Sequence, residues 1–193
     1  MTLRRFRLRP SNTFAAILVR NDDSKLLSRL GHDHVVRAAE FTSTLSLDPD
    51  DPQALRFALS FPVTSLVVDH PDDRRRVGLD PDVSQKDRRQ TKKNMLASSQ
   101  LDADSFGNID FRVSGANVEE PGRWILNASL VVKLHRHDFE FPVDLQVDPT
   151  LRVQGRTDVT HDDLNLQPYR APMGTLQNAS TMTLVIDVDA APL

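Results

Sequence analysis

Hydrophobic and polar residues alternate along most of this chain, which is the pattern of strands that bury one face. The clearest row is Leu55, Phe57, Leu59, Phe61 and Val63, which alternates with polar or small residues such as Arg56. The same alternation occurs over residues 14–19, 41–47, 109–113, 124–134, 139–147 and 182–188. Because Pro, Gly, Asn and Asp turns separate these short segments, the pattern predicts an all-β, antiparallel sandwich or barrel.

Two segments depart from the alternation and predict helices. Residues 24–30 carry leucines at helical spacing and are followed by a glycine, which is a common helix stop. Residues 84–99 form the longer helix, with Ser84 as its N-cap and Asp87 in its first turn. Residues 69–82, which are rich in Asp, Pro and Arg, predict a mobile loop before the second helix.

The composition is that of an ordinary globular protein. A length of 193 residues suits one domain, residues 1–193, with a core over about 14–189. The net charge of −3 argues against nucleic acid as the main partner. The basic runs 74–76 and 86–93 are interleaved with acids and have no aromatic stacking platform, which favours a solvated loop and a solvated helix face.

The N-terminal region predicts neither a signal peptide nor a transmembrane segment. Its apolar run, residues 14–19, is too short for either and ends in charged residues. We therefore expect a cytoplasmic protein as the chain is written, and a periplasmic one if a signal segment was removed. The chain has no cysteine, which excludes disulfides and thiolate metal sites and leaves both compartments open. A homodimer also stays open.

Several weak motifs occur in an order that resembles the YceI-like family. Within residues 93–118, a helix end with a Leu-x-Ser segment is followed by a Leu-Asp-Ala turn and an Ile-x-Phe strand. Gly107 stands where the family commonly has proline. Residues 66–68, 127–143 and 163–174 resemble further family segments in the expected order. The resemblance extends over roughly residues 14–189, and the order of the motifs carries it.

The resemblance implies an extended, lipocalin-like antiparallel barrel with a helix covering one end and an apolar tunnel inside. Members of the family bind long isoprenoid or acyl chains, and most act as carriers without a known reaction. An eight-stranded barrel has room for one slender ligand. The alternating rows then supply its interior wall: Phe57, Leu59, Phe61, Ile109, Phe111, Val132 and Leu134. The alternative is that these side chains simply fill a solid core.

Histidines form two His-x-His pairs, His32 with His34 and His135 with His137. On a strand, residues i and i+2 face the same side, so each pair could direct two imidazoles at one point. With His161 as a further ligand, they would suit a transition metal. The alternative is that they form hydrogen bonds with polar loops at a barrel rim. The Gly-His-Asp-His string that contains the first pair also resembles a subgroup of the family.

Two functional hypotheses follow. The first is a carrier, without enzymatic activity, that holds an elongated amphipathic ligand such as an isoprenoid or a fatty acid. The second is a metal- or polar-ligand-binding protein built on the histidines, with an enzyme of unknown reaction as one version. A surface adaptor is a third interpretation that no residue favours. The chain has no Gly-x-Ser-x-Gly, His-Glu-x-x-His or P-loop motif. We therefore expect a lipid-like partner, no catalytic residue and no certain cofactor.

Overall fold

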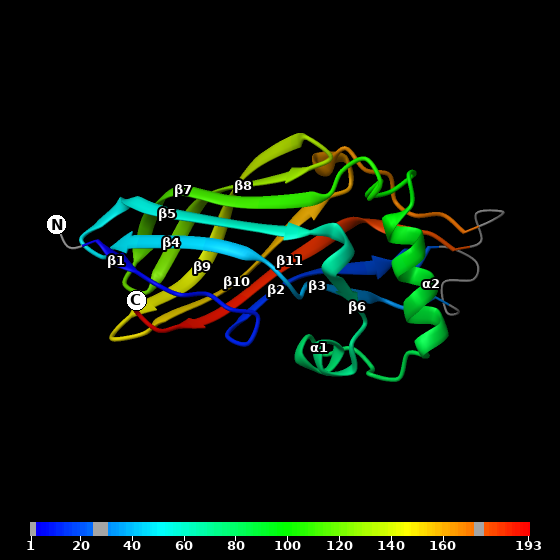
Figure 1. Ribbon diagram of the computed structural model, residues 1–193, viewed down its shortest axis with the longest axis horizontal. Helices are drawn as coiled ribbons and strands as arrows, with labels where there is room; N and C mark the ends of the chain where they lie inside the picture. The colour runs from blue at the N-terminus through cyan, green and yellow to red at the C-terminus, as the bar shows by residue number, and fades with distance from the viewer. Residues whose placement is uncertain (1–2, 25–30, 172–175) are drawn as a thin grey trace.

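The computed structural model describes residues 3–24, 31–171 and 176–193, and these form a curled antiparallel sheet with two α-helices at one end (Figure 1). The helices are α1 (Pro71–Arg76) and α2 (Gln85–Leu96), and the short 3-10 turns are η2 (Val63–Ser65) and η3 (Asp162–Leu164). The strands are β1 (Arg4–Arg5), β2 (Thr13–Asn21), β3 (His34–Ala38), β4 (Thr42–Asp48), β5 (Asp51–Pro62), β6 (Leu66–Val68), β7 (Asn108–Glu120), β8 (Arg123–Val132), β9 (His135–Val147), β10 (Leu151–Thr160) and β11 (Asn178–Ala190). The all-β class is confirmed.

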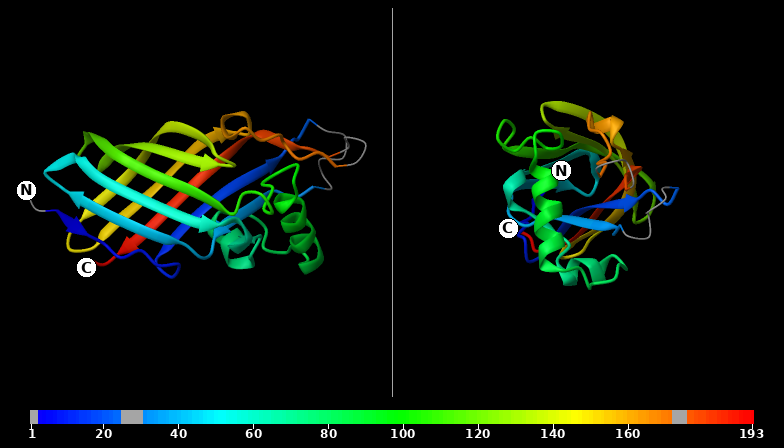
Figure 2. Two further views of the ribbon diagram at one scale, coloured as in Figure 1. Left: turned by 45° about the horizontal axis from the view of Figure 1, so that its top comes forward. Right: turned by 90° about the vertical axis from the view of Figure 1, so that its right-hand side faces the viewer.

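The strands are hydrogen-bonded in the order β1-β4-β5-β7-β8-β9-β10-β11-β2-β3-β6. Most of them continue into a neighbour through a short turn, for example at Gly122, whose φ of 86° suits glycine, between β7 and β8. Figure 2 shows that the sheet curls about its long axis until its two edges approach each other. The shape is an elongated barrel-like shell, as the sequence predicts.

The chain itself joins the two edges of this sheet. At one end, the N-terminal segment pairs with β4 and also forms a bridge from Phe6 to Pro192, just after β11. Backbone hydrogen bonds from Arg7 to Ala191 and from Leu193 to Arg5 strengthen that bridge. At the other end, β5 passes through η2 directly into β6, which pairs with β3. The bridge to Pro192 thus gives the β1 edge a contact beyond β11, and η2 links the β6 edge covalently to β5.

The main hydrophobic core lies inside the shell. Leu55, Phe57 and Leu59 of β5 are all buried, while Arg56 between them is exposed, so the predicted alternation is confirmed in this strand. Most strands contribute to the same apolar cluster. Strand β2 differs because both of its faces are apolar. Ile17 packs against the interior, whereas alternate residues such as Phe14 pack in a second cluster.

Helix α1 overturns the prediction of a mobile loop over residues 69–82. Pro71 occupies the first turn, acidic residues follow it, and three arginines end the helix, which is the charge order that the helix dipole favours. The outer face of β2 explains why this segment is ordered, because Val77 and Leu79 after α1 pack on that second apolar cluster. Arg76 also lies over the Phe14 ring, 4.5 Å from its centroid.

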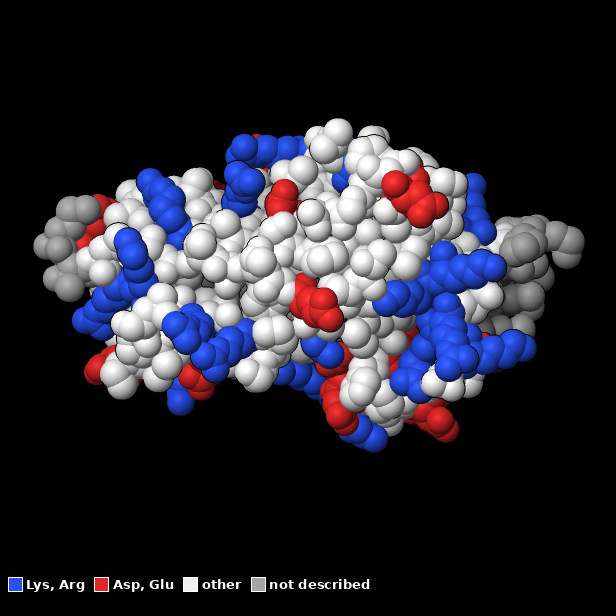
Figure 3. All heavy atoms as spheres, viewed as in Figure 1, with Lys and Arg blue, Asp and Glu red and all other residues white. Residues whose placement is uncertain are grey.

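Helix α2 confirms the second predicted helix. Ser84 caps it, because its hydroxyl accepts a hydrogen bond from the Asp87 backbone N–H at 3.1 Å. Figure 2 shows α2 lying across one end of the shell. Lys86, Arg89 and Lys93 are exposed, and Figure 3 shows the basic surface over this region, which confirms a solvated helix face. The other predicted helix, residues 24–30, lies almost wholly outside the described residues.

Gly155 marks a strand that the sequence pattern does not predict, β10. A Cβ atom at this position would lie 2.7 Å from the Pro142 carbonyl oxygen and 2.6 Å from a Val143 methyl group. No side chain fits between β9 and β10 here, so the glycine that interrupts the alternation also permits the pairing.

We predict that Gly155→Ala lowers the free energy of unfolding by about 1–3 kcal/mol, because the new methyl group forces the two strands apart. Urea denaturation followed by circular dichroism measures the change. Gly107→Ala is the matched control, since a Cβ there meets nothing within 4 Å and the residue does not have a positive φ. Equal stability of the two variants would contradict the close packing at Gly155.

Candidate functional site

An internal cavity of about 240 Å³ lies between the concave face of the sheet and α2. Its wall is mainly aliphatic and aromatic. The apolar residues that line it are Ala15, Ala16, Ile17, Val19, Val36, Ala38, Leu59, Phe61, Leu66, Met95, Leu101, Ile109, Phe111, Leu130, Val132, Phe141, Leu164, Leu166, Met182, Leu184, Val185 and Ile186. Because they come from β2, β3, β5 to β9 and β11, the curled sheet surrounds much of this half-open space.

Five of the seven residues predicted for the interior wall line this cavity: Leu59, Phe61, Ile109, Phe111 and Val132. The strand register explains their proximity, since Leu59 lies opposite Phe111 and Phe61 lies opposite Ile109 in adjacent strands. Side chains of directly paired residues share one face of a sheet. The period-two pattern therefore predicts this part of the wall. The role of these five residues in binding a ligand remains a prediction.

Phe57 lies beyond this cavity, in the wall of a smaller apolar pocket of about 30 Å³. Phe111 and Ile186 line both spaces and so lie between them. The Phe111 ring packs edge-on against Phe57, with centroids 5.8 Å apart, and edge-on against Phe141 at 6.2 Å. The aromatic cluster thus closes the inner end of the larger cavity.

The prediction that Leu134 faces the interior is wrong. Leu134 is 84 % exposed and lies at the tip of the hairpin between β8 and β9. Lys133 and Leu134 have positive φ angles of 48° and 64°, which is the geometry of a tight two-residue turn. The alternation of β8 ends at Val132, so the turn carries the next apolar residue out into solvent.

Polar residues gather at the end of the cavity near α2. They are His34, Thr91, Asn94, Gln100, His161, Tyr169 and Asn178. Thr91 and Asn94 come from α2, while His34 begins β3 and Asn178 begins β11. Figure 1 shows α2 and the starts of β3 and β11 at the same end of the sheet. The cavity is therefore amphipathic, with a long apolar wall and a polar mouth.

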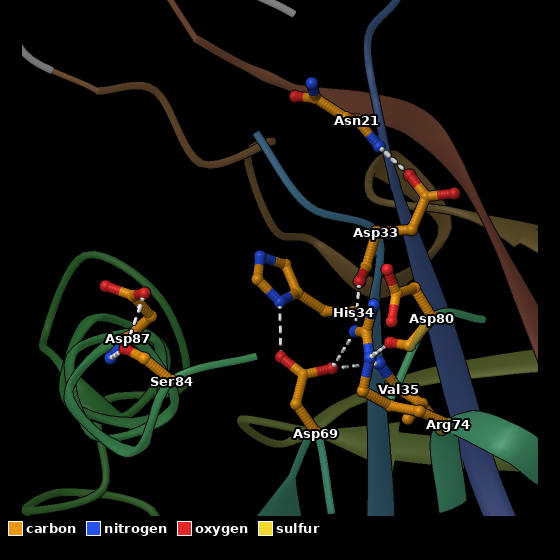
Figure 4. Close-up of polar contacts among 9 residues, drawn as sticks. All are labelled: Asn21, Asp33, His34, Val35, Asp69, Arg74, Asp80, Ser84 and Asp87. Atoms are coloured by element: carbon orange, nitrogen blue, oxygen red, sulfur yellow. Dashed lines mark hydrogen bonds and ion pairs between the residues drawn. The ribbon is translucent and has the colours of Figure 1, made fainter. Parts of the chain in front are cut away.

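His34 belongs to a buried polar cluster behind the cavity wall (Figure 4). Its Nδ1 lies 2.6 Å from one carboxylate oxygen of Asp69, which is fully buried. The other oxygen accepts hydrogen bonds from the Val35 backbone N–H at 3.0 Å and from Arg74 at 2.7 Å. Arg74 also donates to the backbone carbonyls of Asp33 and Asp80. Both carboxylate oxygens of Asp69 thus have hydrogen-bond partners, as burial requires.

The same contacts keep Asp69 ionised. Burial alone would raise the pKa of this carboxyl, but the hydrogen bond and charge of His34 and the hydrogen bonds from Val35 and Arg74 outweigh it. The net effect is a pKa below the ordinary value of 3.8. An ionised Asp69 accepts hydrogen bonds only, so the His34 proton lies on Nδ1 and the ring is held in one orientation.

His161 is the second histidine on the cavity wall and is only 4 % exposed. Its Nδ1 lies 2.9 Å from the Ser180 backbone oxygen and donates a hydrogen bond to it. Burial lowers the pKa of His161 below the ordinary 6.5, against the opposing effects of the Ser180 carbonyl and of Asp162. The ring is therefore neutral near pH 7.

The remaining histidines do not join these two. His135 Nε2 lies 3.1 Å from the backbone oxygen of Asp163, and His137 Nδ1 lies 3.9 Å from the Asp163 carboxylate. Hydrogen bonds from Thr160, together with the charge of His137, hold the pKa of Asp163 below its usual range. His32 is exposed. Within the described parts of the chain, no group of three or more His, Cys, Asp or Glu side chains could hold a metal ion. The metal hypothesis therefore finds no ligand set there.

Sequence reasoning missed the partner of His34, Asp69, and the arginine that donates to Asp69, Arg74. Nothing in the alternation distinguishes a buried aspartate from the exposed ones around it. Residues 71–76 carry acidic residues first and arginines last, which is the charge order of a helix and the one signal in the sequence for this cluster. A helix at this place brings Arg74 close to Asp69. Asp69 also has a positive φ of 52°, a conformation that aspartate adopts more readily than most residues.

We predict that the protein loses stability as the pH falls below about 6.5, and that His161→Asn reduces this loss. Because burial lowers the pKa of His161 in the folded state, the folded protein binds fewer protons than the unfolded protein below about pH 6.5. The contribution of His161 to the free energy of unfolding is therefore fully present above pH 6.5 and is lost as the pH falls through the folded-state pKa. Asparagine can still donate to Ser180 but does not titrate. Thermal unfolding between pH 5 and 8 measures the difference, and identical pH profiles would contradict it.

Known proteins resemble this chain in structure but not in sequence, and the structural similarity supports the fold. No family model matches the chain, and no curated protein matches it. Burkholderia cenocepacia BcnA is similar in structure with a TM-score of 0.71 and 11 % identity, over 96 % of this chain and 100 % of that one.

Two further solved structures share the architecture. A polyisoprenoid binding domain from Saccharophagus degradans, implicated in plant cell wall breakdown, has a TM-score of 0.60 and 10 % identity over the full length of both chains. The Campylobacter jejuni YceI protein has a TM-score of 0.58 and 8 % identity over 81 % of this chain and 83 % of that one. The chain therefore has the YceI-type fold that its ordered motifs imply.

Proposed function

We propose that this protein is a carrier that holds an elongated amphipathic molecule, such as an isoprenoid or a fatty acid, in the cavity beneath α2. The observation that carries the proposal is the space of about 240 Å³ on the concave face of the sheet, with an apolar wall and polar residues at one end. That division matches a molecule with a long apolar chain and one polar end. The similar domain from Saccharophagus degradans, described as polyisoprenoid binding, supports the same ligand class.

The size and shape of the cavity favour a slender ligand. Pockets for drug-sized molecules usually measure about 300–1,000 Å³, which is larger than this space. Each CH₂ group moved from water into an apolar wall contributes about 0.8 kcal/mol. Affinity should thus increase with chain length until the chain reaches the cluster of Phe57, Phe111 and Phe141 at the inner end.

We retain the sequence-based expectations for the partner and the compartment of this carrier. Within the described residues, no helix is both long and apolar enough to cross a bilayer. The proposed partner is a lipid-like small molecule, and the proposal includes no nucleic acid and assigns no reaction. The compartment and a homodimer stay predictions.

Val132→Trp tests the proposal because its indole group would fill the cavity that Val132 lines. We expect native mass spectrometry of the gently purified wild-type protein, alone or after addition of a long-chain isoprenoid alcohol, to show a one-to-one complex. The variant should bind at least tenfold more weakly, since it leaves less room for the chain.

Leu134→Trp is the matched control, because Leu134 lies at an exposed hairpin tip outside the cavity. Circular dichroism checks that both variants fold. A wild-type protein that binds neither isoprenoid nor fatty acyl chains would overturn the proposal. Equal binding by both folded variants would show that the chain lies somewhere other than this cavity.

A further inference from the structure

The two histidines on the cavity wall share one chemical property. In each of them Nδ1 is already occupied, by the Asp69 carboxylate for His34 and by the Ser180 carbonyl for His161. Both of these partners are acceptors, so the ring proton lies on Nδ1. In its neutral form, such a ring has Nε2 as a free hydrogen-bond acceptor. No protein group within the described residues donates to either Nε2 atom.

The two rings lie at a similar level of the sheet but not side by side. His34 is paired with Val19 of β2, Val19 with Met182 of β11, and Met182 with Val159 of β10, two residues before His161. Adjacent strands are about 4.8 Å apart, so three strand spacings place β3 and β10 roughly 14 Å apart along the curled sheet.

His34 is the better placed of the two for the polar end of a ligand. Its side chain is 19 % exposed, whereas His161 is almost completely buried. Figure 4 shows the second ring nitrogen of His34 on the side away from Asp69. The Asp69 cluster also holds the ring in place, because Asp69 is fixed by Val35 and Arg74. A fixed acceptor loses little freedom when it binds a donor.

We propose that His34 is the head-group residue of the cavity and that it selects ligands whose polar end carries a hydroxyl group. This inference rests on the proposed carrier function and makes it more specific. A hydroxyl group donates to Nε2 of His34, while its chain follows the apolar wall. A methyl ether of the same chain has no donor, and a carboxylate offers only acceptors. Long-chain alcohols are thus the class that the ring orientation favours.

The test uses three ligands with the same apolar chain: an alcohol, its methyl ether and the corresponding acid. We expect the wild-type protein in mildly alkaline buffer to bind the alcohol about fivefold more tightly than the ether, the effect of one net hydrogen bond. In His34→Asn the amide can still donate to Asp69 but lacks the far acceptor, so this preference should disappear. Isothermal titration calorimetry measures the affinities.

Two further variants make the result specific. His34→Gln places an amide oxygen near the position of Nε2 and should restore part of the preference for the alcohol. His32→Asn is the matched control, because His32 is an exposed histidine of the same motif that does not line the cavity. Thermal unfolding confirms that each variant folds.

The outcomes separate this inference from the carrier function. If the ether binds but the alcohol has no advantage, or if the advantage persists in His34→Asn, the head-group assignment is wrong and the carrier function stands. If the acid binds most tightly in a manner that depends on His34, the residue is an anion site and the preference for hydroxyl groups is wrong. If none of the three ligands binds, the carrier function itself fails.

Discussion

A sheet can enclose an open space only if its edges are held, and in this protein the chain holds both of them. The N-terminal segment forms a bridge through Phe6 and Pro192 beyond β11, and η2 carries β5 directly into β6 beside β3. Free edges would expose unpaired backbone groups, and an uncurled sheet would bring the inner apolar rows into water. The backbone bridge at one joint and the chain connection at the other therefore maintain the curl that the cavity requires.

Helix α2 and the cluster around Asp69 complete the structure at the polar end. Removing a charged pair from water is costly, and the contacts of Asp69 with Arg74, His34 and a backbone N–H compensate for that cost. The cluster connects α1, the start of β3 and the end of β6. It also fixes one imidazole at the polar end of the cavity wall.

The sequence was informative where local periodicity decides the structure and uninformative where distant contacts do. Phe111 and Val132 could be placed on the inner wall because alternation along a strand is a local property. Leu134 could not, because the hairpin turn, rather than the alternation, decides its position. The sequence predicts a loop over residues 69–82 because the outer apolar face of β2, on which this segment packs, cannot be recognised until the sheet is assembled. The histidine pairs suggested convergence, whereas the fold gives His34 and His137 different aspartate partners.

The central claim is that the shell encloses a binding space for a chain-like ligand with its polar end near α2. A crystal structure with a long-chain alcohol brominated at its far end tests this most directly, because anomalous scattering locates the bromine. The account predicts the bromine near Phe111 at the inner end of the cavity, and the hydroxyl group near His34 at its polar end. Bromine on the outer surface, or at the α2 end with the hydroxyl group deep inside, would contradict it.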